Sequence, residues 1–155
     1  MRSSTLLGLG FATAILVSSC SSGPTKRYFP PQASLQQLQR IANGQWQAQV
    51  RIQNFSTGAV EFKNLALNIQ IQDLEWTTIA PAEMQKIGPN NAEIFTLSIP
   101  FNANISQVLS ERLNKAQSIR YTLKGSIQST DPNKTYPLDY QGRLNPAPGL
   151  DGVYR

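Results

Sequence analysis

The feature that most constrains the fold is an alternation of apolar and polar residues that recurs along the chain. In Gln45–Gln53 every second residue is apolar, and the residues between them are Gln or Arg. Successive side chains of a β-strand point to opposite faces, so this pattern predicts a strand with one buried and one wetted face. The same alternation predicts further strands in residues 60–71, 94–101, 119–128 and 136–144.

The parity of the apolar positions changes within the second of these runs. Val60 and Phe62 are apolar at even positions, whereas the apolar positions from Leu65 onward are odd. A strand keeps one face buried across such a change only if a residue is inserted or the strand bends. The sequence therefore predicts a β-bulge, or a bend between two sheets, around Lys63-Asn64.

Two segments depart from the alternation. Ile105–Ala116 has apolar residues at helical spacing, and Asn104 with Gln107 resembles a capping box. We expect this short helix to pack across an open end of the sheets. In Ala33–Ile41 three aliphatic residues stand three apart, which suits either a helical turn or a strand with a bulge.

These elements predict an all-β fold. Six or seven short strands with one-sided alternation imply two antiparallel sheets packed face to face, with one short helix. A chain of 155 residues suits a single domain. We place a signal peptide at 1–19, a lipidated cysteine and flexible tether at 20–32, the β-sandwich at 33–145 and a C-terminal tail at 146–155. The expected core includes Val50, Ile52, Leu67, Ile69, Leu97, Leu123 and Leu138.

The N-terminal residues predict the cellular location of the protein. Arg2 precedes an apolar stretch, Leu6–Val17, that is shorter than the about 20 residues a membrane-spanning helix needs. The tetrapeptide Val17-Ser18-Ser19-Cys20 resembles the bacterial lipobox, which implies cleavage between Ser19 and Cys20 and acylation of Cys20. The alternative is an ordinary signal peptide with an incidental cysteine. Ser21, by analogy with enteric bacteria, predicts anchoring to the outer membrane, facing the periplasm.

Composition excludes several catalytic designs. The chain has no histidine and a single cysteine, Cys20. This excludes histidine-based acid–base catalysis, His/Cys zinc sites and intramolecular disulfides. The formal net charge is +5, but no basic run exceeds Lys26-Arg27, so we expect no nucleic-acid partner. We likewise expect no catalytic residue, no cofactor and no metal site.

Three polar residues and a set of aromatic residues are the alternatives to this expectation. Asp73 and Glu75 stand two apart and would share a side in a continuing strand, but a solvated strand end is favoured over paired acid–base groups. Asn54 is expected to bond the adjoining turn through its side chain. Five aromatic side chains could stack on a sugar: Trp46, Trp76, Phe95, Tyr121 and Tyr140. Core positions are favoured for the first four.

The order of these elements resembles a known family. Trp46-x-Ala48-x-Val50-x-Ile52-x-Asn54, followed by the Leu-rich run Leu65–Ile71, is similar to the type 2 late embryogenesis abundant family, which includes the water-stress-and-hypersensitive-response (WHy) domain. Ile87-Gly88-Pro89, the short helix and the last two strands agree. The resemblance implies an immunoglobulin- or fibronectin-III-like β-sandwich of about seven strands, and a bacterial lipoprotein with a role in stress or desiccation protection.

Two classes of function follow. The first is a non-catalytic envelope lipoprotein whose Gln-rich exterior binds weakly to membranes or client proteins; eight of the 22 residues from Gln32 to Gln53 are Gln. The second is a binding module for a lipid, a glycan or a partner complex. A large apolar cavity between the sheets, opening under Ile105–Ala116, would favour lipid binding, and a tightly filled core would favour protection. The oligomeric state is not determined by the sequence.

Overall fold

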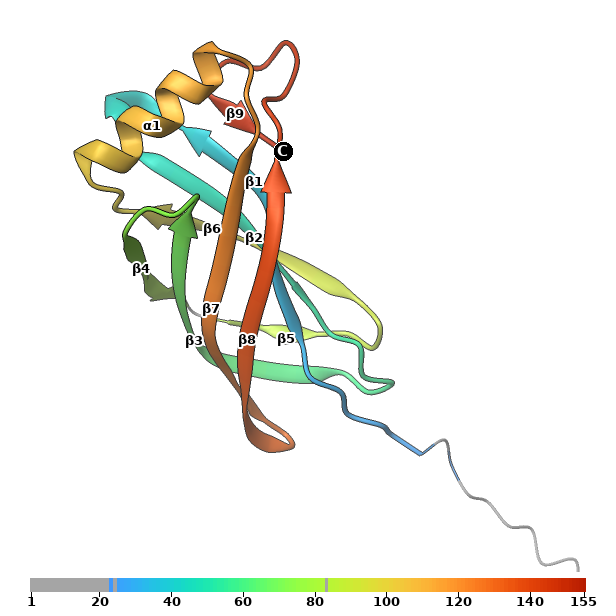
Figure 1. Cartoon of the computed structure of the whole chain (residues 1–155). Helices are drawn as coiled ribbons and strands as arrows, with labels where there is room; N and C mark the ends of the chain where they lie inside the picture. The colour runs from blue at the N-terminus through green and yellow to red at the C-terminus, as the bar shows by residue number, and fades with distance from the viewer. Residues whose placement is uncertain (1–22, 24, 83) are drawn as a thin grey trace, which may run out of the picture.

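The chain folds as two antiparallel β-sheets packed on each other, as seen in Figure 1. The computed structural model describes residue 23, residues 25–82 and residues 84–155. One sheet has the strand order β6-β2-β1-β9, and the other has β4-β3-β7-β8 with β5 paired to β3. The predicted all-β sandwich is confirmed. The elements are β1 (Gln32–Arg40), β2 (Trp46–Gln53), β3 (Val60–Ile71), β4 (Trp76–Ala82), β5 (Lys86–Ile87), β6 (Ala92–Ile99), α1 (Ala103–Asn114), β7 (Ile119–Thr130), β8 (Asn133–Leu144) and β9 (Val153–Tyr154), with a 3-10 turn at Ala42–Gly44.

The core lies between the two sheets and is built by the alternating apolar positions. All seven residues predicted for it are buried, and Leu97 is the most accessible at 9%. Lys124, which follows Leu123 in β7, lies on the exposed face of the same strand. The periodicity therefore assigned the inner and outer faces of the long strands correctly.

The ambiguous segment before residue 42 is a strand with a bulge. β1 pairs with β2 in antiparallel register, and the register shifts between Leu35 and Gln37. Because the bulge changes the parity, Leu35 and Leu38 are both buried although they stand three residues apart. The spacing that also suited a helical turn is thus the signature of an irregular strand.

The parity change in β3 is a bulge within one continuous strand. The pairing of β3 with β7 is irregular between Lys63 and Ala66, and Asn64 has a φ of 50°, a conformation that asparagine tolerates better than most residues. The strand opposite accommodates the bulge with a glycine. A Cβ placed on Gly125 would lie 2.0 Å from the carbonyl oxygen of Ala66, so a larger residue would displace one of the two strands.

The helix closes one end of the sandwich, as expected, but it begins earlier than the sequence suggested. The predicted cap at Asn104 is wrong: the Asn102 side chain accepts a hydrogen bond from the Ile105 amide at 2.9 Å and caps the helix, while Asn104 lies inside it. Ile105 and Leu109 are buried against the sheets. Figure 1 shows α1 at the end opposite to the one from which the N-terminal segment leaves.

The C-terminal residues belong to the domain, so the predicted boundary at residue 145 is wrong. β9 adds an edge strand beside β1 through the pairs Leu38↔Tyr154 and Gln39↔Val153. Tyr154 is fully buried, and its hydroxyl donates a hydrogen bond to the Leu109 carbonyl at 2.9 Å. Local sequence gave no sign of this strand because two residues are too few to display a period.

Candidate functional site

The two carboxylates weighed as an acid–base pair do not form one. Asp73 and Glu75 lie in the turn between β3 and β4 and are both exposed. Asp73 lies 3.5 Å from the guanidinium of Arg120, and Glu75 accepts a hydrogen bond from the Asn102 side chain at 3.0 Å. Each carboxylate therefore has its own structural partner, in line with the favoured interpretation of a solvated turn.

The aromatic residues separate into an inner and an outer group. Trp46 and Tyr121 are buried and Phe95 is partly buried against the core, as expected. Tyr140 is also partly buried there. Trp76 differs: 45% of it is exposed, so the favoured core position for this residue is wrong. It begins β4, the edge strand, and its ring faces solvent with the Lys124 ammonium 5.9 Å from its centroid.

Tyr121 joins the two sheets through its hydroxyl. That oxygen accepts a hydrogen bond from the Leu35 amide at 3.1 Å and lies 3.4 Å from the Leu35 carbonyl oxygen, to which it donates. Burial raises the pKa of Tyr121 to about 12, although the bond to Leu35 opposes this shift. Burial also raises the pKa of Tyr154 to about 12, against the opposing charge of Arg112. Both phenols are structural hydrogen-bonding groups that stay neutral near neutral pH.

Asn54 organises the loops at the end opposite to the helix. Its side-chain amide donates to the carbonyl oxygens of Gly58, Ile87 and Gly88 at 3.0, 3.2 and 2.9 Å, and its oxygen accepts from the Ser56 amide at 2.9 Å. The predicted bond to the adjoining turn is therefore present. The side chain is fully buried and also links a second loop, which the sequence did not indicate.

The chain that leads toward the N-terminus is bound to this same end. The Arg27 amide donates to the Thr57 hydroxyl at 2.8 Å, and the Phe29 amide donates to the Ser56 hydroxyl at 3.0 Å. Residues 27–29, predicted as part of a flexible tether, thus lie in place along the loop 54–59. The predicted cleavage site Ser19-Cys20 and the lipidation site Cys20 lie outside the described residues.

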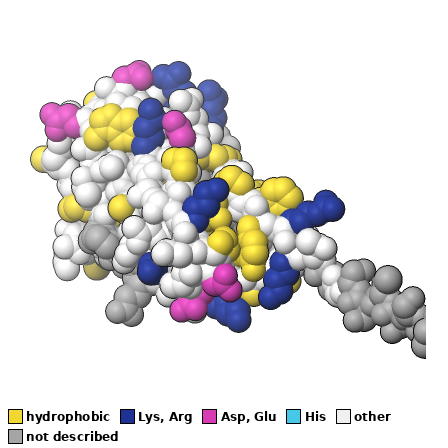
Figure 2. Space-filling view, turned by 90° about the horizontal axis from the view of Figure 1, so that it is seen from below, with side chains coloured by type: hydrophobic (Ala, Val, Ile, Leu, Met, Phe, Trp, Pro, Cys, Tyr) yellow, Lys and Arg dark blue, Asp and Glu magenta, His cyan; other side chains and the backbone are white. Residues whose placement is uncertain are grey.

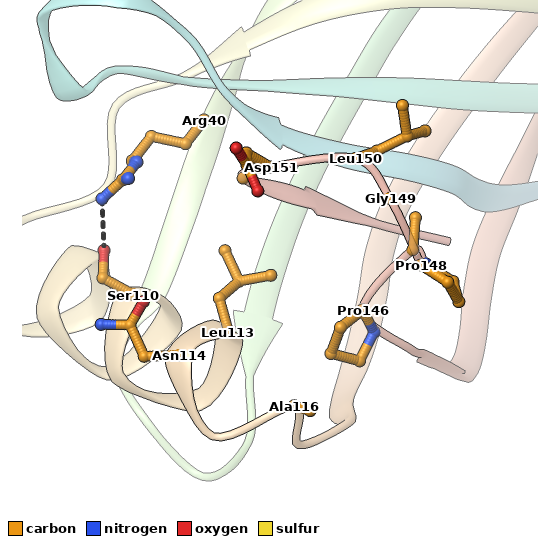
Figure 3. Close-up of a pocket in the computed structure, with 12 residues that line it drawn as sticks. Arg40, Ser110, Leu113, Asn114, Ala116, Pro146, Pro148, Gly149, Leu150 and Asp151 are labelled. Carbon is orange, nitrogen blue, oxygen red and sulfur yellow. Dashed lines mark hydrogen bonds between the residues drawn. The ribbon is translucent and has the colours of Figure 1, made fainter.

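A pocket of about 550 Å³ lies at the helix end, between α1 and the segment 146–152 that leads into β9. Figure 3 shows Leu113 on the helix and Pro146 on the C-terminal segment, while Arg40 donates a hydrogen bond to the Ser110 hydroxyl at 3.4 Å. All of its lining residues are half-buried or exposed, so the pocket is a surface feature and does not enter the space between the sheets. Its mixed lining gives hydrogen-bonding and apolar contacts but no acid–base pair.

Sequence reasoning missed several parts of this arrangement. No periodicity or motif in the sequence indicated the strands β4 and β5, the hydrogen bonds of Asn54 to two loops, or the pocket beside the C-terminal segment.

Within the described residues, no helix is long and apolar enough to cross a membrane. In the same part of the chain, no group of three or more His, Cys, Asp or Glu residues could hold a metal ion.

Comparison with known proteins supports the fold. No protein-family model and no curated protein matches the sequence. The solution structure of AT1g01470 from Arabidopsis thaliana is similar, with 12% identity, coverage of 81% of this chain and 88% of that chain, and a TM-score of 0.53. A crystal structure of a protein from Archaeoglobus fulgidus has 10% identity, covers 77% of this chain and 97% of that chain, and has a TM-score of 0.39. The X-ray structure of Northeast Structural Genomics Consortium target SoR45 has 13% identity, covers 81% of this chain and 89% of that chain, and has a TM-score of 0.42. At these identities the likeness to the Arabidopsis protein extends to the fold and no further.

Proposed function

We propose that this chain is a non-catalytic lipoprotein of the bacterial cell envelope, anchored by an acylated Cys20 and protecting membranes or proteins during drying and other stress. The observation that carries the proposal is an exterior rich in amide side chains. In β2, Gln47, Gln49 and Gln53 alternate with buried residues and are half-exposed. Amide side chains both donate and accept hydrogen bonds, so such a surface holds water and makes weak contacts with many partners.

Three further observations support this proposal. The sequence Val17-Ser18-Ser19-Cys20 supplies an anchor. The resemblance to the type 2 late embryogenesis abundant family agrees with a protective role. The buried polar groups described above, Asn54 and Tyr121, bond to backbone groups and hold loops and sheets together. Protection of this kind depends on a folded, anchored domain and on no single polar side chain.

The test is survival after drying or osmotic shock of a deletion strain complemented with variants of the gene. Cys20→Ala should abolish protection because the anchor is lost, and Leu123→Asp should abolish it because a charge enters the core. Asp73→Asn, Glu75→Gln and Trp76→Ala should leave survival near that of the wild type. If one of these three variants folds and localises normally but gives no protection, the chain works through a discrete polar site and the proposal is wrong.

A second candidate function is docking onto a partner complex in the envelope, and the pocket at the helix end favours it. The pocket combines Leu113 and Pro146 with the polar groups of Arg40 and Asn114, a composition suited to one loop of a partner protein. Cross-linking in intact cells should then capture the same protein with the wild type and lose it with Leu113→Glu. A deletion strain that survives drying normally but loses such a complex would favour this candidate over protection.

A further inference from the structure

The excess of positive over negative charge in this protein comes from its N-terminal part. Between residues 20 and 60 the sequence has four basic residues and no acidic one, whereas residues 61–155 contain nine of each. Two of the four, Lys26 and Arg27, are adjacent, and both are exposed. Arg40 lies at the helix end and Arg51 in β2, so Lys26-Arg27 is the basic pair that lies where the chain leaves the sandwich.

Lys26 and Arg27 are held against the domain. Besides the bond from the Arg27 amide to Thr57, the Thr57 amide donates to the Arg27 carbonyl at 3.0 Å. The Lys26 side chain lies over Gly58, where a Cβ would be 3.4 Å from the Lys26 Cδ. Residues 25–27 and Thr57 also line a hollow of about 490 Å³. The backbone that carries the two charges is therefore held against the domain, beside a space large enough for a lipid headgroup.

Two exposed aromatic residues belong to the same two segments of chain. Phe29 and Phe55 are 47% and 45% exposed; Phe29 follows Arg27 by two residues, and its amide donates a hydrogen bond to Ser56, the neighbour of Phe55. Figure 2, which views this end of the molecule, shows hydrophobic and basic side chains, with acidic ones among them, near the point where the chain leaves. We call Lys26, Arg27, Phe29 and Phe55 the basic-aromatic patch. Basic and aromatic side chains together are typical of surfaces that lie at a membrane interface.

The chain length fixes how far this patch can be from the anchor. Cys20 and Arg27 are seven residues apart, and a fully extended chain of that length spans at most about 25 Å. The helix end is farther away by the length of the long strands, about 40 Å for 12 residues. If Cys20 carries the lipid, the basic-aromatic patch belongs to the end of the sandwich that this short chain keeps close to the bilayer.

We propose that the basic-aromatic patch docks on the anionic surface of the bilayer in which Cys20 is anchored. This inference rests on the lipid anchor in the proposed function. Lys26 and Arg27 contact headgroup phosphates, while Phe29 and Phe55 enter the interface between headgroups and acyl chains. The anchor makes this contact intramolecular, at an effective concentration on the order of millimolar, so a patch of two charges and two aromatic rings is sufficient. The sandwich then stands with its helix end facing away from the membrane.

The test uses the full lipidated protein, reconstituted into vesicles of phosphatidylcholine alone or mixed with phosphatidylglycerol, with bromine on the acyl chains as a tryptophan quencher. The reporter is Phe55→Trp combined with Trp76→Phe. The wild type is its matched control, because Phe55 and Trp76 are each 45% exposed and both proteins keep the buried Trp46. We expect strong quenching of the reporter in vesicles with phosphatidylglycerol, weak quenching of the wild type, and loss of the difference at high salt.

Charge reversal tests the electrostatic contribution. Each basic residue near an anionic surface changes binding about fivefold, so Lys26→Glu with Arg27→Glu should lower the ratio of docked to undocked protein by about 25-fold or more. Lys115→Glu with Arg143→Glu changes the net charge equally, uses exposed residues away from the patch, and should leave quenching unchanged. If the Phe55→Trp protein proves unstable in urea, Phe29→Trp in the same background is the second reporter.

The outcomes separate this inference from the proposed function. Protein that does not float with the vesicles lacks a lipid anchor, which overturns both. Protein that floats, but whose reporter is quenched no more than the wild type, keeps the anchor and overturns the docking. Equal quenching on both lipid mixtures, unaffected by charge reversal, would show that the patch lies near the bilayer without recognising anionic lipid, and would overturn docking on an anionic surface. A blue-shifted reporter without quenching would assign the patch to a protein surface, such as a second copy, and would also overturn the proposal.

Discussion

The two ends of the sandwich are closed by different chemistry. At the tether end, where the chain leaves toward Cys20, Asn54 bonds four backbone groups and holds the loops 54–59 and 88–91 together. At the helix end, the apolar side chains of Ile105 and Leu109 close the core, and Tyr154 bonds the helix backbone. A polar network fixes a geometry through one residue, whereas apolar packing spreads its stabilisation over many contacts. The loop geometry at the tether end therefore depends on one residue, and a single substitution there should destabilise the protein more than one at the helix end.

The largest effect should come from Asn54→Ala at the tether end. The change leaves three carbonyl groups, two of them in buried hydrogen bonds, and one amide without their partner, at about 1–3 kcal/mol for each group that water does not reach. We expect a loss of about 4 kcal/mol in the free energy of unfolding, measured in urea. Asn68→Ala is the matched control, because Asn68 is half-exposed and accepts one hydrogen bond from Thr78, and it should cost less than about 1 kcal/mol. Equal losses would remove the distinction between the ends.

The next effect tests the helix end. Leu109→Ala deletes a fully buried side chain of α1 and should cost about 3 kcal/mol, since the cavity it leaves collapses only partly. Val108→Ala, one residue earlier on a half-buried position, should cost about 1 kcal/mol or less. Urea melts of the two variants measure the difference. A larger loss from Val108→Ala would mean that the helix presents a different face to the sheets.

Alkaline pH should weaken the helix end through Tyr154. The pKa of Tyr154 is about 12 in the folded protein against 10.0 when unfolded, so the folded state keeps its proton while the unfolded state loses one. Stability is therefore full below pH 10 and falls, by about 2 kcal/mol for this tyrosine, as the pH rises toward 12. Tyr154→Phe should flatten the decline in pH-dependent urea melts. A decline of the same slope in that variant would assign the effect to Tyr121 or other groups.

The smallest effect is expected outside both ends. Asp73→Asn removes the ion pair with Arg120, whose two side chains are largely exposed, and should cost no more than about 0.5 kcal/mol. Thermal melts at low and high salt provide the measurement. A loss above about 2 kcal/mol would indicate that the turn between β3 and β4 contributes to folding far more than its exposure implies.

The sequence predicted those parts of the fold that depend on local periodicity. The buried faces of β2, β3 and β7, the bulge near Asn64 and the helix face of Ile105 and Leu109 all follow from spacing alone. Asn54 was identified as a structural residue, but its second loop was not, because residues 87 and 88 approach it only in the folded chain. Trp76 was misplaced because its exposure depends on β4 being an edge strand, which a short run without clear alternation does not reveal.

The contacts of residues 27–29 with the domain could likewise not be predicted from the local sequence. Its Ser, Gly and Pro content is typical of a flexible linker, and this composition gave no sign that Arg27 and Phe29 bond to Thr57 and Ser56. These contacts join residues about thirty positions apart, so they depend on the loop that Asn54 holds. The candidate membrane-facing patch therefore emerges only when the tether and the loop 54–59 are seen together.

Anchoring of the sandwich through an acylated Cys20 can be measured from the mass of the N-terminal peptide of the mature protein. Protein expressed in a bacterium and extracted from its membranes should begin at Cys20 and carry the added mass of a diacylglyceryl group, with or without a further acyl chain. Cys20→Ala should yield either an uncleaved chain or soluble protein without that mass. A mature chain that begins elsewhere, or an unmodified Cys20 in a wild-type protein that is fully soluble, would contradict the account.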